Sequence, residues 1–266
     1  MTDLPPPGPS VPARLGISAA VDDGELLLAL EPRPEHLVHG RVRAAVHVFL
    51  IDLIAGLRIN VGDGAWTLTN DLTVRAEAVL APPRIEARAV PVRQGRRSAA
   101  WAVDITAGTD VVAVGVAGFV ILARRGGDPP KPDTSPAAAM ARFTGHGVSL
   151  AAPLREEAHI ESIDPSSGTV EVDVTHDLLN TNGTMQGAMV ALVAEAAAED
   201  LVQARFGVRA VITELDVRYL NRVETGRVRA TSRMLGSDST SPIEVRLHDL
   251  DRDRITTLVY ARATVV

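Results

Sequence analysis

The stretch NGTMQGAMVALVAEAAAE, residues 182–199, is the strongest indication of the fold in this sequence. Small and polar residues open it, an alanine-rich apolar run follows, and one carboxylate, Glu195, lies well inside that run. A helix that is apolar nearly all round is covered by other elements on most of its sides. The stretch therefore predicts a long helix near residues 184–205 that is enclosed by the rest of the protein.

The chain repeats this design once, at a constant offset of 143 residues. The offset aligns Gly40 with Gly183 and Asp52 with Glu195, and the alignment continues without gaps into the following strands. On each side, short strands precede one long apolar helix and four strands follow it, which places the first helix near residues 40–59. Two copies of one unit predict a fused dimer with a pseudo-twofold axis. Each unit is expected to be α+β, with an antiparallel sheet around one helix.

Breaker-rich segments divide the 266-residue chain. Residues 1–14 are rich in proline and are expected to be disordered. Residues 124–136 combine glycine, proline and charge, as a linker does. The expected domains are therefore residues 15–123 and residues 137–266.

Composition excludes several classes of protein. The net charge is -6 with no basic cluster, which argues against nucleic acid as a partner. The absence of cysteine excludes disulfides and thiolate metal sites, and it fits a reducing compartment. No apolar run has the length of a signal peptide at the N-terminus or of a membrane span anywhere. We expect a soluble cytoplasmic protein without a membrane partner.

Asp52 is the first candidate functional residue. Its neighbours at positions 48–51 and 53–55 are all apolar, so no polar stripe carries it to solvent. Burial of an unpaired carboxylate costs several kcal/mol and raises its pKa, which a protein tolerates where the group is paired or used. Asp52 is therefore either a functional acid or the partner of a nearby arginine such as Arg43 or Arg58.

Glu195, the counterpart of Asp52, is less distinctive by itself. Glu199 and Gln203 follow it at steps of four residues, so the three side chains could form an ordinary solvated face of the helix. The pattern leaves this interpretation and a functional one open.

The segment before the second helix, NTNGTMQGAM at residues 180–189, supplies groups that bind a carbonyl oxygen. Asn180 and Gly183 belong to a turn, and Thr184 is placed to cap the helix. Gln186 and Gly187 then fall in the first helical turn, where backbone N–H groups are unpaired and the helix dipole is positive. Such an end suits a carbonyl oxygen that becomes an oxyanion, and glycine permits its close approach.

These residues resemble the signature of the hotdog-fold acyl-CoA thioesterases of the PaaI-like and 4-hydroxybenzoyl-CoA type. That signature is Asn, Gly three residues on, then His-Gly-Gly, and an acid nine residues after the His. The matching positions here are Asn180, Gly183, Gln186, Gly187, Ala188 and Glu195. Gln186 replaces the usual His, and Ala188 replaces the second Gly. The resemblance covers most of residues 157–266 and, through the repeat, residues 16–122 more loosely.

The resemblance implies a double hotdog that hydrolyses acyl-CoA, with no cofactor and no metal. In hotdog dimers of this type, each active site takes its loop from one subunit and its acid from the other. Carried onto the fused pair, one site would combine Asn180, Gln186 and Gly187 with Asp52. The opposite site would join Glu195 to a loop that has Arg43 in place of Gln186.

The implied mechanism gives each group a role. The Gly187 N–H polarises the thioester carbonyl, and Gln186 or Asn180 orients the thioester or the water. Asp52 acts as a general base or as a nucleophile. Two further residues, Asn70 and Thr213, follow the acids by 18 positions and could position the water.

Substrate contacts are expected along the same segment and the two helices. The expected contacts are with Gly183, Thr184 and Ala188, and small apolar residues such as Ala191 and Val48 are expected to line a tunnel for the acyl group.

Two other functions remain open. A hotdog hydratase or dehydratase acts on the same thioesters but needs a catalytic histidine, and none of the histidines at 36, 39, 47 and 176 occupies the required position. A non-catalytic module that binds acyl-CoA is the second alternative, because the loop of the first half has lost its carbonyl-binding residues. In each case we expect the chain to form a homo-oligomer.

Overall fold

The computed structural model describes residues 10–59, 65–125, 133, 135–143 and 149–266. The regular elements of the first half are β1 (Ser18–Asp22), β2 (Glu25–Leu30), β3 (Leu37–Val38), β4 (Arg41–Val42), α1 (Ala44–Arg58), β5 (Ala65–Ala76), β6 (Ile85–Gln94), β7 (Ser98–Ala107) and β8 (Asp110–Ala123). Those of the second half are α2 (Pro136–Phe143), α3 (Leu154–Glu157), β9 (Glu161–Asp164), β10 (Thr169–Val174), α4 (Gly187–Phe206), β11 (Ala210–Tyr219), β12 (Gly226–Met234), β13 (Ile243–Asp249) and β14 (Arg254–Val265).

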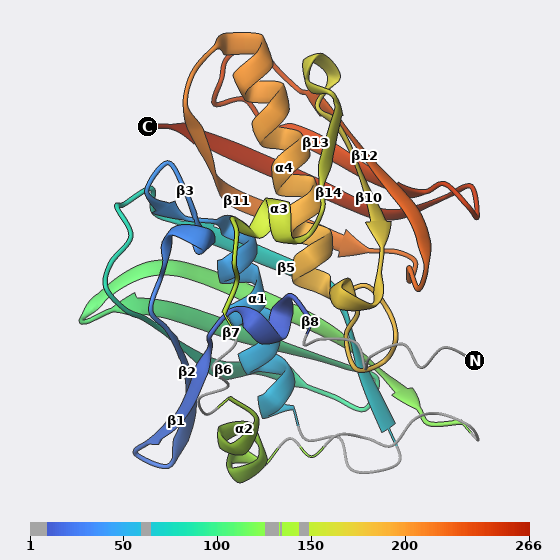
Figure 1. The fold of residues 1–266 in the computed structure, drawn as a ribbon. Helices are drawn as coiled ribbons and strands as arrows, with labels where there is room; N and C mark the ends of the chain where they lie inside the picture. Colours follow the sequence, from blue (N-terminus) through green and yellow to red (C-terminus); the bar gives the residue numbers. More distant parts are fainter. Residues whose placement is uncertain (1–9, 60–64, 126–132, 134, 144–148) are drawn as a thin grey trace, which may run out of the picture.

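One antiparallel sheet of 12 strands joins the two halves, in the order β1-β2-β6-β7-β8-β5-β11-β14-β13-β12-β10-β9. The order from β1 inward is repeated by the order from β9 inward, strand for strand. The sheet therefore consists of two copies of one six-stranded unit that meet where β5 pairs with β11 (Figure 1).

The register at this junction confirms the predicted repeat. Thr73 of β5 lies opposite Asp216 of β11, and these two residues are 143 positions apart, which is the offset of the repeat. A residue that pairs with its own counterpart marks the place where a twofold axis crosses a sheet. Gly40 and Gly183 also share a left-handed conformation, with φ of 76° and 71°.

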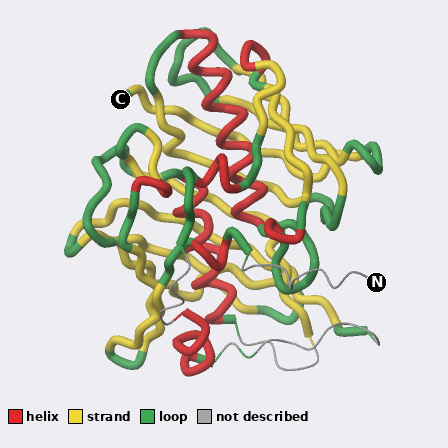
Figure 2. Tube along the Cα trace, in the orientation of Figure 1, coloured by secondary structure: helices red, strands yellow, loops and turns green. Residues whose placement is uncertain are grey.

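The two long helices lie against one face of the sheet and form the centre of the core (Figure 2). In α4, every residue from Ala188 to Ala198 is buried. Alanine has the smallest apolar side chain, so it allows the curved sheet and the other helix to approach the α4 backbone closely. Both helices begin three or four residues later than predicted, because Arg43 and Gln186 are still extended and only cap the helices.

The ends of the predicted domains differ in part from expectation. Residues 1–9 lie outside the described residues, but residues 12–14 of the predicted disordered segment form a 3-10 turn with Val11 buried beside it. The Val11 N–H donates to the carbonyl oxygen of Asp177, so this segment packs on the second half. Most of the predicted linker lies outside the described residues, and α2, which follows it, packs on β1 of the first half.

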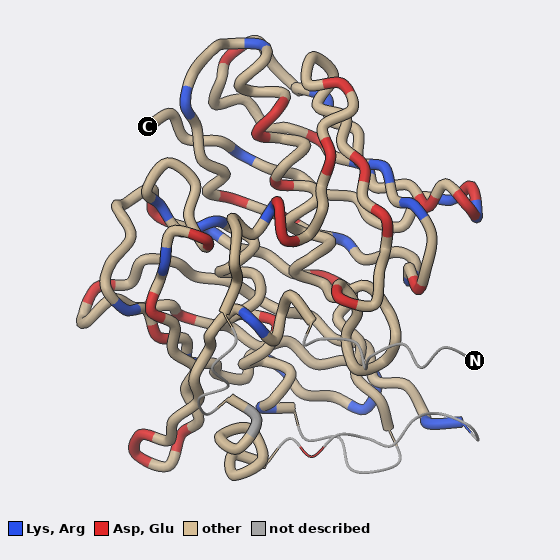
Figure 3. Tube along the Cα trace, viewed as in Figure 1, with Lys and Arg blue, Asp and Glu red and all other residues tan. Residues whose placement is uncertain are grey.

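Acidic and basic residues are interspersed along the described trace (Figure 3). None of the helices in the described ranges has the length and apolar character needed to cross a membrane.

Candidate active site

Asp52 lies on α1 where that helix faces the first turn of α4. Two of the described residues donate hydrogen bonds to the carboxylate: Thr69 Oγ1 to Oδ1 at 2.6 Å, and Gln186 Nε2 to Oδ2 at 3.3 Å. Burial raises the pKa of Asp52 above its ordinary value, and the hydrogen bond from Thr69 opposes that rise. Neither Arg43 nor Arg58 pairs with it; both have other carboxylate partners. Asp52 is therefore a desolvated carboxylate held by neutral donors.

Gln186 connects this acid to the helix of the other half. Its Oε1 accepts hydrogen bonds from the backbone N–H groups of Ala188 and Met189, and this fixes which end of the amide faces Asp52. Gln186 is thus the N-cap of α4, a role that the sequence assigned to Thr184. The loop of the second half and the acid of the first half do come together, as the resemblance implied.

Asn180 lines the cavity beside Asp52, but the loop uses its polar atoms. Oδ1 accepts from the N–H groups of Asn182 and Thr184, and Nδ2 donates to Thr184 Oγ1 at 3.0 Å. These bonds close the turn whose left-handed residue is Gly183. Asn180 therefore shapes the loop that presents Gln186, and no contact with Asp52 supports the orienting role predicted for it.

Thr69 is a site residue that sequence reasoning missed by one position. The predicted residue, Asn70, also lines the cavity, but its side chain donates to Asp71. β5 is irregular between Thr69 and Asp71, so alternation along the strand breaks at Asn70 and Thr69 faces the acid. Thr213 occupies the matching irregularity of β11 and bonds to Thr264 instead of Glu195.

Gly187 is the first residue of α4 and borders Asp52. Among the described residues, no hydrogen bond of its N–H group is found, whereas the next two N–H groups are taken by Gln186. A Cβ at this position would lie 3.4 Å from Asp52 Oδ2 and 3.1 Å from the hydroxyl oxygen of Tyr219. Among the described residues the position therefore offers an N–H donor without a partner, and a side chain here would crowd both Asp52 and Tyr219.

A cavity of about 270 Å³ contains these groups. Its lining includes Asp52, Thr69, Gly187 and Tyr219, and its apolar part consists of Leu68, Val120, Met185, Val190, Leu220 and Val223. The predicted apolar lining is wrong in detail: Ala188, Ala191 and Val48 are buried but do not border this cavity.

A wider hollow of about 520 Å³ adjoins the cavity. The two hollows share Leu68 and Arg222. Trp66, Asn182 and Arg125 also line the second hollow, so an aromatic ring and two guanidinium groups border it.

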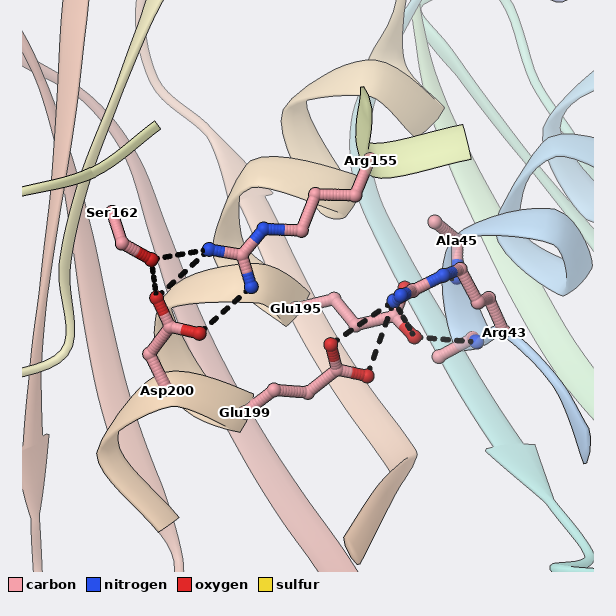
Figure 4. A network of polar contacts seen from close by, with 8 residues as sticks. Arg43, Ala45, Arg155, Ser162, Glu195, Glu199 and Asp200 are labelled. Carbon is pink, nitrogen blue, oxygen red and sulfur yellow. Dashed lines mark hydrogen bonds and ion pairs between the residues drawn. The ribbon is translucent and has the colours of Figure 1, made fainter. Parts of the chain in front are cut away.

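The opposite site is arranged differently. Glu195 is fully buried, and its two oxygens accept hydrogen bonds from the N–H groups of Ala44 and Ala45, at 3.2 and 3.0 Å (Figure 4). Ala44 is the counterpart of Gly187. The acid of the second half therefore occupies the helix end where a carbonyl oxygen would have to bind.

Arg43 completes the closure of this second site. Its guanidinium lies 3.5 Å from Glu195 and 3.0 Å from Glu199, and it is itself 6% exposed. Glu199 thus turns toward the arginine rather than forming a solvated face. Burial raises the pKa of Glu195 to about 7, against the opposing effect of Arg43. Beside it, Arg155 pairs with Asp200, which extends the ionic network along α4 (Figure 4).

None of the histidines that the structure describes lines the cavity. His47 is buried on α1 with its pKa lowered to about 4 by burial. In the described part of the chain, no three His, Asp or Glu side chains are grouped so that they could hold a metal ion.

Comparison with known proteins places the fold. No family model and no curated protein matches the sequence. Among solved structures, the chain is similar to the tesB protein of Mycobacterium avium subsp. paratuberculosis, with a TM-score of 0.64 and 9% identity over 96% of this chain and 98% of that one. It is also similar to the 12:0-ACP thioesterase of Umbellularia californica, with a TM-score of 0.59 and 9% identity over 90% and 97% of the two chains.

An acyl-ACP thioesterase of Bacteroides thetaiotaomicron gives a TM-score of 0.58 and 8% identity over 95% of this chain and 99% of that one. Similarity at identities this low is evidence for a shared fold and not for a shared function. The likeness spans both halves together and agrees with the order of the strands. The chain has the α+β double hotdog fold.

Proposed function

We propose that the chain is a thioesterase that hydrolyses an acyl-CoA to the free acid and CoA. One observation carries the proposal: Asp52 of the first half is held by Gln186 and Thr69 beside the N–H of Gly187, which has no hydrogen-bond partner among the described residues. A base next to an oxyanion donor, inside a cavity, is the arrangement that acyl transfer to water requires.

Asp52 acts in this proposal as the general base. Its pKa is raised by burial, which makes the carboxylate a better proton acceptor. It removes a proton from water as the water oxygen attacks the thioester carbon, and the negative charge that develops on the carbonyl oxygen is stabilised by the Gly187 N–H. Such a donor contributes about 3 kcal/mol to lowering the barrier. The C–S bond then breaks, and the sulfur receives the proton from Asp52.

The role of Asp52 as a base rather than a nucleophile has its own test. A single turnover in ¹⁸O-labelled water, with enzyme in excess, places the label in the product acid if Asp52 is a base. A nucleophilic carboxylate forms an anhydride with the acyl group, and attack of water on the aspartyl carbon of that anhydride would leave label in Asp52. Label in the peptide that contains Asp52, detected by mass spectrometry, would therefore show that Asp52 is a nucleophile.

The lining of the second hollow favours CoA as the thiol. Arg222 borders both hollows and Arg125 borders the second one. Guanidinium groups pair with phosphates in a bidentate manner, and Trp66 offers a face on which an adenine can stack. We expect Arg222→Ala to raise KM for an acyl-CoA several-fold and to leave KM for the matching acyl-pantetheine, which has no phosphate, unchanged. Equal effects on both thioesters would remove the reason for naming CoA.

The decisive experiment follows the release of free thiol from a panel of thioesters. Acetyl-, hexanoyl-, decanoyl- and benzoyl-CoA are compared with the same acyl groups on a carrier protein, using the wild type and Asp52→Asn. Release by the wild type that disappears in the variant supports the proposal. Release from the carrier alone would change the substrate class, and no release from any thioester would overturn the activity.

The apolar lining suggests an aliphatic or compact acyl group. Each buried methylene contributes about 0.8 kcal/mol, so KM should fall along the aliphatic series until the cavity is filled. A flat KM across acetyl-, hexanoyl- and decanoyl-CoA would contradict an apolar acyl site.

A non-catalytic acyl-CoA-binding protein is the second candidate, and the closed site around Glu195 favours it. A chain that had lost one site could have kept the other for binding alone. Titration with a non-hydrolysable thioether analogue separates the two functions: tight binding without any thiol release would support the binding module. A hydratase is disfavoured, because no histidine is found among the described residues that line the cavity.

We also propose that chains associate into a homo-oligomer. Val90, Val92 and Val116 on the outer face of the first-half sheet are 61%, 64% and 38% exposed, and contiguous apolar surface of this kind favours association. Light scattering after size exclusion measures the mass, and a monomer at micromolar concentration would contradict the proposal.

A further inference from the structure

Tyr219 is the last residue of β11 and reaches the first turn of α4. Its hydroxyl donates a hydrogen bond to the carbonyl oxygen of Gly187 at 3.0 Å, and its side chain lines the cavity. Burial, with the nearby Asp52 carboxylate, raises its pKa well above the ordinary value, so the phenol keeps its proton. The residue in the same place of the first half is Ala76.

The hydroxyl oxygen of Tyr219 and Asp52 Oδ2 both lie close to Gly187. A Cβ on Gly187 would be 3.1 Å from the first and 3.4 Å from the second. Because Gly187 has no side chain, no atom at this position separates the two oxygens from the cavity that both residues line. A phenol has one proton and spare lone pairs, and the proton is already used by the Gly187 carbonyl. Toward the cavity, Tyr219 therefore presents an acceptor, as Asp52 does.

Two hydrogen-bond acceptors that line one cavity match the two protons of a water molecule. We propose that Tyr219 is a further catalytic residue, which accepts a hydrogen bond from the attacking water while Asp52 accepts the other. The inference rests on the proposed thioesterase function. With both protons directed at these oxygens, a lone pair of the water points at the thioester carbon.

The step balances with the groups already named. The water oxygen forms a bond to the acyl carbon, one proton passes to Asp52, and the hydrogen bond to Tyr219 keeps the second proton on the water oxygen. The C–S bond then breaks, the sulfur takes the proton from Asp52, and the second proton leaves with the acid. Tyr219 neither gains nor loses a proton in this cycle.

A purely structural role for Tyr219 is disfavoured by the other half of the molecule. There, α1 begins at Ala44, the counterpart of Gly187, although Ala76 provides no hydroxyl to hold it. The start of the helix therefore does not depend on the tyrosine.

The test compares Tyr219→Phe with Tyr260→Phe. These are the two tyrosines of the chain, and Tyr260 lies on β14 with its hydroxyl directed at Glu244. Tyr219→Phe is expected to lower kcat roughly 10- to 100-fold, the usual cost of one hydrogen bond to a reacting group. KM, the melting temperature and the pH at the midpoint of the acidic limb should stay as in the wild type. Tyr260→Phe should keep the wild-type kcat.

Each other outcome overturns the inference. A wild-type kcat in Tyr219→Phe would show that the hydroxyl is not used, and a rise in KM alone would assign Tyr219 to substrate binding. A shifted pH midpoint would show that it acts through Asp52. These results leave the proposed function intact if the wild type releases thiol, whereas absence of thiol release from the wild type overturns both.

A second measurement keeps the inference testable if Tyr219→Phe does not fold. In the Tyr260→Phe background Tyr219 is the single tyrosine, so growth on 3-fluorotyrosine labels it alone. Fluorine weakens the phenol oxygen as an acceptor without removing it. A few-fold lower kcat at unchanged KM is expected, and an unchanged kcat would overturn the inference.

Discussion

The N-termini of α1 and α4 occupy equivalent positions, yet their free N–H groups are used differently. At α4, Gln186 accepts from the N–H groups of Ala188 and Met189, and none of the described residues accepts a hydrogen bond from the N–H of Gly187. At α1, the residue in the place of Gln186 is Arg43, which has no acceptor. Glu195 of the other half supplies the missing acceptor: its carboxylate accepts hydrogen bonds from the N–H groups of Ala44 and Ala45.

The difference shows how a few side chains decide whether a carboxylate is structural. Glutamate is one methylene longer than aspartate, so Glu195 reaches the helix end, whereas Asp52 stops short of it and bonds to Thr69 and Gln186. The Arg43 cation adds a charged partner that Asp52 lacks. A carboxylate that caps a helix and pairs with arginine has its oxygens occupied by structural contacts. A carboxylate that is held by neutral donors beside a cavity can accept a proton from a bound molecule.

Replacement of each acid in turn tests most directly whether Asp52 is catalytic and Glu195 structural. Asp52→Asn removes the base and should lower kcat roughly 10³-fold, within the usual range for loss of a general base. Glu195→Gln should keep kcat within about threefold of the wild type, because Glu195 binds a helix end and not a substrate. Thiol release with a saturating acyl-CoA measures both, and the melting temperature checks that both fold. The reverse ranking would show that the Glu195 site is the working one.

Gly187→Ala tests whether the absence of a side chain at the start of α4 matters. The added methyl group would lie 3.1 Å from the Tyr219 hydroxyl and 3.4 Å from Asp52 Oδ2, which is tight enough to displace these two side chains. We expect a fall in kcat of roughly 10²-fold, as for other small displacements of a reacting group. The matched change in the other half, Ala44→Gly, should leave kcat unaltered and cost about 1 kcal/mol of stability. A methyl group at 187 without effect would place the reaction elsewhere.

Thr69→Val tests a hydrogen bond that only one of the two acids has, because the counterpart of Thr69 in the other half is Ile212. The hydrogen bond from Thr69 favours the charged carboxylate, so its loss raises the pKa of Asp52 further. The acidic limb of the pH profile of kcat/KM should move to higher pH, and the plateau should fall about 10-fold. Thr73→Val, on the outer face of the same strand, is the control. An unmoved limb would mean that Asp52 is not the titrating base.

The sequence predicts the larger features of this molecule and not the finest ones. The repeat and the two apolar helices predicted two fused α+β units, each with an antiparallel sheet around one helix, and the family resemblance identified these units as hotdog domains. The offset of 143 residues reappears in the pairing of Thr73 with Asp216. The meeting of Gln186 with Asp52 followed from the family resemblance. Residues that depend on local irregularity were missed: the break in β5 turns Thr69 rather than Asn70 to the acid.

The closure of the second site could not be predicted for a different reason. Glu195, Glu199 and Gln203 recur at steps of four, a pattern that fits a solvated face as well as a buried one. What distinguishes the two is Arg43, which is more than 150 positions away in the chain and contacts Glu195 only after the halves have packed. Tyr219 was missed likewise, since its partner Gly187 is 32 positions earlier.

The smallest expected effect concerns stability in the closed site. Burial raises the pKa of Glu195 from 4.5 to about 7, so the native state holds this proton more tightly than the unfolded state. Its contribution to the free energy of unfolding is therefore complete below pH 4.5 and is lost as the pH rises to about 7. Glu195→Gln cannot titrate, so the wild type should lose stability relative to this variant across that range. Urea unfolding of both proteins at several pH values measures the difference, with Glu161→Gln at an exposed strand as control. A difference independent of pH would mean that Arg43 keeps Glu195 ionised throughout, which would make the closed site an ion pair at every pH at which the protein folds.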